Sequence, residues 1–175
     1  MGRQSHARSL SVWVNGRLTG EWRIPARGET EFQYESTWVE SEEGRPLSLS
    51  LPFSLDRGSI KGRPVECYFD NLLPDADLIR KRVQDRFHTE SRDAFDLLAA
   101  IGRDCVGAVQ LFPSGEQPKD VHAIEAAPLS ETEVERALIQ TVAPASVAAQ
   151  PADDDCRISI AGAQEKTAFL EHDGR

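Results

Sequence analysis

The start of the chain constrains the fold most, because an alternating segment leads directly into a tight-turn signal. Residues 9–14 alternate in the manner of a half-buried strand. Asn15-Gly16 follows, and both residues tolerate the positive φ angles that a two-residue hairpin turn requires. Residues 18–24 are the candidate returning strand. The sequence therefore predicts an antiparallel β-hairpin that runs from Ser9 to Ile24.

Other short strands are expected before residue 60. Residues 32–34 predict a third strand, and residues 36–40 predict a single helical turn. Residues 46–52 alternate leucine with serine between two prolines, and this pattern favours a short or edge strand with its leucines on one face. The first sixty residues thus predict a small, strongly twisted antiparallel sheet.

Helical patterns occupy the stretch between residues 66 and 102. Residues 67–73 predict a short helix that Pro74 ends. A second helix is expected through residues 78–87, capped by Asp75 or Asp77. Its arginines are expected to face water, namely Arg80, Arg82 and Arg86.

A third helix is expected to begin at the N-cap Ser91 and to end at the C-cap Gly102. Residues 106–112 then predict another strand. With this strand the first domain is complete, and its expected range is residues 1–112.

The remainder of the chain divides into a linker and the start of a second unit. Residues 113–156 predict a linker that contains a helix at 130–142, which Ser130 and Glu133 open as a capping box. Residues 157–175 predict two short strands around a loop of small residues.

The overall charge and the cysteine pattern limit the possible partners. The formal net charge is −9, so direct binding to nucleic acid is not expected. No apolar run reaches the roughly 20 residues that span a bilayer, so no membrane contact is expected. The three cysteines are widely spaced and form no CxxC, which favours reduced thiols in a cytoplasmic protein. The widely spaced histidines predict no metal site.

The loop of small residues near the end of the chain has the chemistry of a phosphate cradle. Gly162, between Ala161 and Ala163, would let backbone N–H groups approach phosphate oxygens. Lys166 could add a positive charge, and Gln164 an amide donor. The setting between two strands is closer to a kinase glycine-rich hairpin than to a Walker A loop. These residues also suit an ordinary hairpin, so the local pattern leaves both readings open.

Five runs of sequence, in order, together resemble the HipA family of bacterial serine/threonine kinases, which are the toxins of HipA–HipB toxin–antitoxin pairs. The matching runs are residues 45–52, 69–75, 95–104, 106–109 and 157–168. The resemblance implies an α+β fold: a small curled, barrel-like antiparallel sheet with capping helices, followed by the start of a kinase-like N-lobe β-hairpin.

The resemblance also implies roles for residues of the loop. Ser159 would be the autophosphorylated serine, and residues 161–164 would lie over the phosphates of ATP. A phosphate on Ser159 adds roughly −1.5 to −2 charges beside that site, so the serine would act as an off-switch. The implied cofactors of the whole enzyme are ATP and Mg²⁺, its implied partner is a HipB-like DNA-binding antitoxin, and its implied substrate is an aminoacyl-tRNA synthetase.

The chain departs from the family pattern in one respect. After the loop, members of the family carry an ATP-binding lysine on the next strand, an Asp-Gly-His-x-Lys-Asn catalytic loop and a metal-binding aspartate. None of these occurs in this sequence. Catalysis by this chain alone is therefore not expected, and no catalytic residue is assigned to it. Three readings follow: the N-terminal part of a kinase that needs its missing C-terminal lobe, a separate regulator that restrains a kinase core, or an inactive remnant.

Overall fold

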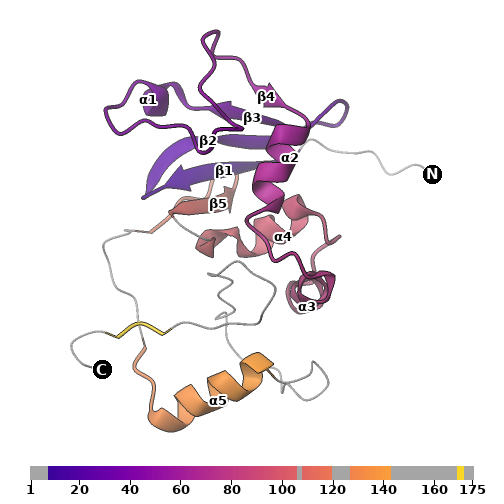
Figure 1. Cartoon of the computed structure of the whole chain (residues 1–175), viewed down its shortest axis with the longest axis vertical. Helices are drawn as coiled ribbons and strands as arrows, with labels where there is room; N and C mark the ends of the chain where they lie inside the picture. Colours follow the sequence, from indigo (N-terminus) through magenta and orange to yellow (C-terminus); the bar gives the residue numbers. More distant parts are fainter. Residues whose placement is uncertain (1–7, 106–107, 120–126, 143–168, 172–175) are drawn as a thin grey trace.

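The computed structural model describes residues 8–105, 108–119, 127–142 and 169–171 (Figure 1). Five strands form one open antiparallel sheet in the order β4-β3-β2-β1-β5. Their bounds are β1 Arg8–Val14, β2 Arg17–Ile24, β3 Glu31–Tyr34, β4 Ile60–Lys61 and β5 Val109–Pro113. The predicted α+β class is confirmed, and the curled sheet stays open, with β4 and β5 at its two edges.

The predicted hairpin forms β1 and β2. Asn15 and Gly16 connect the strands with φ angles of 49° and 74°, which are the positive values that such a turn needs. The strands pair from Arg8 with Ile24 to Val14 with Arg17, and a register shift lies between Val12 and Trp13. This bulge increases the local twist of the sheet.

Two of the helices, α2 and α4, begin more than one residue from the predicted position. They are α1 Ser36–Val39, α2 Arg63–Asp70, α3 Asp77–Phe87, α4 Ala94–Ile101 and α5 Glu131–Val142, and a short 3₁₀ turn covers Gly102–Asp104. The expected helical turn at residues 36–40 is confirmed as α1.

Helix α2 starts at Arg63, before the predicted start at Cys67, because Pro64 fits the first turn, where its missing N–H is not needed. The predicted N-caps of α3 and α4 are also wrong, whereas Gly102 is the C-cap of α4 as predicted. Ala76 precedes α3 and Asp93 precedes α4, and neither makes a side-chain capping bond.

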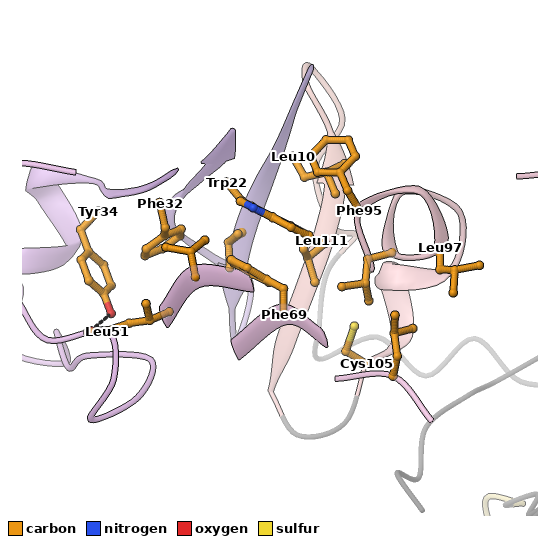
Figure 2. Packing of buried hydrophobic residues seen from close by; sticks show 14 of the residues in the cluster. Leu10, Trp22, Phe32, Tyr34, Leu51, Phe69, Phe95, Leu97, Cys105 and Leu111 are labelled. Atoms are coloured by element: carbon orange, nitrogen blue, oxygen red, sulfur yellow. Dashed lines mark hydrogen bonds between the residues drawn. The ribbon is translucent and has the colours of Figure 1, made fainter. Parts of the chain in front are cut away.

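The alternating leucines did not form the predicted strand. Within this segment residues 48–51 instead make a tight turn, in which the N–H of Leu51 donates to the carbonyl of Ser48 at 3.0 Å. Leu49 at the turn is fully exposed, whereas Leu51 is fully buried. The Tyr34 hydroxyl holds this turn, because it donates to the carbonyl of Leu51 at 2.6 Å (Figure 2). It also accepts from the N–H of Leu47 at 2.8 Å. A side chain therefore satisfies backbone groups that a neighbouring strand would otherwise bond.

The hydrophobic core lies between the sheet and helices α2 and α4. Figure 2 shows Phe69 of α2 and Phe95 of α4 directed toward Trp22 of β2. The largest fully buried side chains include Phe32, Leu10 and Leu111. Helix α3 packs on α4 rather than on the sheet. Within the described ranges, no helix is long and apolar enough to cross a membrane.

The predicted capping box opens α5. Ser130 Oγ accepts a long bond of 3.4 Å from the N–H of Glu133, and Glu133 Oε2 accepts from the N–H of Ser130 at 2.8 Å. The bonds from the Ser130 side chain and backbone lower the pKa of the Glu133 carboxyl. The predicted hairpin of residues 157–175 lies outside the described residues, apart from 169–171, which form neither helix nor strand.

Candidate functional site

The predicted phosphate loop lies outside the part of the chain that the structure describes. This holds for Ser159 and for the five loop residues Ala161, Gly162, Ala163, Gln164 and Lys166. Their roles therefore stay predictions. Among the described residues, no three His, Cys, Asp or Glu side chains gather in a way that could hold a metal ion.

A polar groove lies between α3 and the start of α4 on the described domain. Its volume is about 570 Å³, and it is lined by Asp77, Arg80, Gln84, Glu90, Ser91, Arg92 and Asp93. It carries charges of both signs, so the contacts of each arginine decide what the groove can do.

Arg80 closes the connection between α2 and α3. Its Nη1 bonds Asp70 Oδ1 at 2.6 Å, and its Nε donates to the carbonyl of Pro74 at 2.7 Å. The side chain is only 15% exposed. The prediction that Arg80 faces water is therefore wrong, because the α2–α3 connection folds back over this arginine. Arg82 and Arg86 are exposed as predicted.

A second polar contact joins β1 to α4. Asp96 is buried, and its two carboxylate oxygens accept from Arg8 and from the Ser91 hydroxyl, the latter at 2.7 Å. Ser91 Oγ also accepts the N–H of Asp93 at 3.0 Å. Ser91 therefore holds the entry to α4 without being its N-cap.

The remaining arginine of the groove, Arg92, forms an exposed pair with Asp77. Its Nη1 contacts Asp77 Oδ1 at 2.7 Å and Oδ2 at 2.6 Å. The carboxylates of Asp70, Asp77 and Asp96 are thus all bonded by arginines. These ion pairs fix α3 to the end of α2 and to the start of α4, and α4 to β1.

Two tyrosines carry the largest pKa shifts among the described residues. Burial raises the pKa of Tyr34 to about 12, although the bond from the N–H of Leu47 acts in the opposite direction. Burial also raises the pKa of Tyr68 to about 12. Both hydroxyls are neutral at pH 7. The Tyr34 hydroxyl has a structural role, because it bonds backbone groups of the turn at residues 47–51.

The fold and the groove define a class of protein domain. An open antiparallel sheet with packed helices, in which charged side chains join its own elements, is a small α+β domain. A family model described as the HipA N-terminal domain matches residues 10–112. The chain therefore belongs to the HipA family, through the N-terminal domain of that family.

Two curated relatives come from Sinorhizobium fredii (strain NBRC 101917 / NGR234). The chain is 31% identical over 172 residues to the protein named "Putative kinase Y4mE", and the match covers 95% of this chain and 39% of the relative. It is 39% identical over 104 residues to "Putative kinase Y4dM", covering 55% of this chain and 25% of that relative. The chain thus matches well under half the length of either relative.

Sequence reasoning did not find the contacts that organise the groove. Arg8 and Asp96 are 88 positions apart, and no local pattern connects them. The charges of Asp70 and Arg80 are closer in sequence, but the helix break at Pro74 obscured their pairing. The described domain supplies structural residues, whereas the candidate chemistry lies in residues 157–168.

Proposed function

We propose that this chain is the N-terminal part of a HipA-type serine/threonine kinase of a toxin–antitoxin system. The observation that carries the proposal is the extent of the match to Y4mE. It covers 95% of the 175 residues, so only a short remainder of the chain stays outside it. Even if that whole remainder were at the C-terminus, Ser159 and Gly162 would fall within the stretch that aligns with a relative named as a kinase.

In the proposed kinase, the loop would contribute contacts to the phosphates of ATP. Backbone N–H groups of residues 161–164 and the Lys166 ammonium group are the proposed donors. Ser159 would be the switch: its Oγ receives the γ-phosphoryl group of ATP and loses its proton, and ADP is left. The added negative charge then disfavours a second polyphosphate beside it.

The sequence of this chain contains no Asp-Gly-His-x-Lys-Asn run. We therefore assign the catalytic residues and the Mg²⁺ ligands to a C-terminal kinase lobe, and we expect this chain to be inactive alone. A HipB-like antitoxin is the proposed partner, and an aminoacyl-tRNA synthetase is the proposed substrate of the whole enzyme in the cytoplasm. These assignments rest on the family resemblance.

A chimeric protein tests the proposal. Residues 1–175 would be joined to the part of Y4mE that follows its matched stretch, and incubated with labelled ATP and Mg²⁺. Mass spectrometry should locate phosphate on Ser159, and Ser159→Ala should abolish that label. Ser50→Ala, at an exposed turn, is the matched control and should leave the label unchanged.

Two outcomes would contradict the proposal. A chimera that phosphorylates other proteins but never Ser159 would refute the proposed role of Ser159 as a switch. A folded chimera without kinase activity, beside an active full-length Y4mE, would show that residues 1–175 do not supply the N-terminal part of such an enzyme. The isolated chain should incorporate no phosphate in either case.

The alternative is a separate regulatory, antitoxin-like module that restrains a kinase core. One observation favours it: the buried hydrophobic cluster runs from Leu10 to Leu111, so the described domain has a core of its own. In this case the isolated chain, added to an active kinase, should inhibit it. If activity is unchanged or increases, the regulatory alternative is excluded.

A further inference from the structure

Helix α5 carries an apolar stripe that remains exposed in the described part of the chain. Leu129, just before the helix, is 50% exposed, and Leu138 and Ile139 are 49% and 58% exposed. Together with Val134, Glu131 and Glu135, these side chains line a shallow groove of about 430 Å³. The stripe therefore forms a continuous apolar surface along one side of the helix.

A helix of this kind requires a partner surface. Helix α5 has 12 residues, and helices of about this length are marginal in water on their own. Its capping box fixes only the first turn. Val134 and Leu138 are one turn apart, so they lie on the same face. Most of the stability of such a helix comes from burying its apolar face, so we expect this stripe to be covered in the functional protein.

A second exposed apolar site lies in the same part of the chain. Phe169 and Leu170 are 44% and 59% exposed. By contrast, the buried core cluster ends at Leu111, within the stretch that matches the HipA N-terminal domain. Most of the large exposed apolar side chains of the described residues thus follow the stretch that matches the HipA N-terminal domain.

The occupant follows from the size of the relative Y4mE. The match covers 39% of Y4mE, so the larger part of that protein has no counterpart in this chain. We infer that the α5 stripe, formed by Leu129, Val134, Leu138 and Ile139, docks on the kinase part of such a protein. This inference rests on the proposed function and names the surface through which the two parts meet.

The charges beside the stripe disfavour a second copy of the chain as the occupant. Glu131 and Glu135 line the groove, and Glu133 lies in the same first turns. In a parallel pair of α5 helices these carboxylates would face their own copies, and in any pair two chains that each have a net charge of −9 would be brought together. The surface suits an apolar partner with a basic rim.

Binding between separate proteins tests the inference. The full chain would be titrated into the part of Y4mE that lies outside the match, and the matched part of Y4mE would serve as the positive control. The double variant Leu138→Ala/Ile139→Ala should bind at least tenfold more weakly. Alanine is the best helix former, so the variant keeps α5 while removing the apolar contacts.

Arg136→Ala is the matched control, because it makes the same type of truncation on an exposed residue outside the groove lining. It should change the dissociation constant by less than threefold. Hydrogen exchange gives a second measurement: amides of residues 134–142 should become protected when the kinase part binds, and those of β1 and β2 should not change.

Each outcome decides the inference. Equal binding by the wild type and the double variant would show that the α5 stripe is not the docking surface, and it would leave the proposed function intact. If the positive control binds and this chain does not, the docking surface is wrong, and the chimera decides the function separately. A concentration-dependent dimer that the double variant abolishes would show that the occupant is a second copy.

Discussion

The indole ring of Trp22 and the phenyl ring of Phe69 are stacked, with centroids 4.0 Å apart and planes 5° from parallel. Phe95 meets the same indole edge-on at 4.9 Å. One tryptophan of the sheet therefore contacts aromatic rings from both α2 and α4 (Figure 2). The Trp22 Nε1–H donates to Thr30 Oγ1 at 2.7 Å, so the polar atom of the ring is also satisfied.

Truncating the stacked ring should destabilise the domain strongly. Phe69→Ala removes a fully buried ring, and we expect the free energy of unfolding to fall by about 3–5 kcal/mol. Urea denaturation followed by tryptophan fluorescence measures the change. Leu78→Ala, at a residue that is 75% exposed on α3, is the control and should cost less than about 1 kcal/mol. A similar loss for both variants would contradict the role of the stack.

Removing the Tyr34 hydroxyl should loosen the turn at residues 47–51. Tyr34→Phe leaves the carbonyl of Leu51 and the N–H of Leu47 without this partner, which should cost about 1–3 kcal/mol. The amide of Leu47 should exchange faster with deuterium. Tyr68→Phe alters the other tyrosine of the chain and should leave exchange at Leu47 unchanged. Unchanged exchange in both variants would refute the role of the hydroxyl.

The two tyrosines should make the fold sensitive to alkaline pH. Burial raises the pKa of both Tyr34 and Tyr68 to about 12 in the folded chain, above the roughly 10 of an exposed tyrosine. The stabilising contribution is complete below pH 10 and is lost as the pH rises toward 12. Tyrosinate absorbance should therefore titrate near pH 12 in the folded protein and near pH 10 in urea. A folded-state midpoint near 10 would show that the rings are accessible to water.

Two arginine pairs of similar geometry should differ in their effect on stability. Arg80 is 15% exposed and also bonds the carbonyl of Pro74, so Arg80→Ala should cost about 1–3 kcal/mol. Arg92 is 46% exposed, so Arg92→Ala should cost about 0–1 kcal/mol. Thermal unfolding of the two variants gives the comparison, and the loss for Arg92→Ala should shrink in high salt. Equal losses would mean that burial does not distinguish the pairs.

Local signals predicted the elements whose cause is local. Asn15-Gly16 encodes the hairpin turn through backbone preferences alone, and Ser130 with Glu133 encodes the start of α5 in the same way. The alternating leucines were misleading, because a turn can produce the same spacing as a strand. Burial of Leu51 depends on Tyr34, which lies 17 residues earlier.

For the candidate site, too, local motifs could be predicted from the sequence, whereas contacts between distant residues could not. The small residues around Gly162 and the family pattern indicate a phosphate loop, but that loop lies outside the described residues. The contact of Arg8 with Asp96 bridges most of the domain, so no pattern within a short window could reveal it. The sequence predicts chemistry where it follows a motif and misses contacts that depend on the tertiary fold.

The pairing of β1 with β5 has a consequence for how the domain is made. Leu10 of β1 lies opposite Pro113 of β5, so the sheet can be completed only after the last strand has formed. Such distant pairing slows folding, because a long segment has to close first. On the ribosome, β1 and β2 can form a hairpin early, but the other edge of β1 stays unpaired until β5 has been synthesised. The nascent chain therefore has a long interval in which a chaperone, or another chain, can bind that edge.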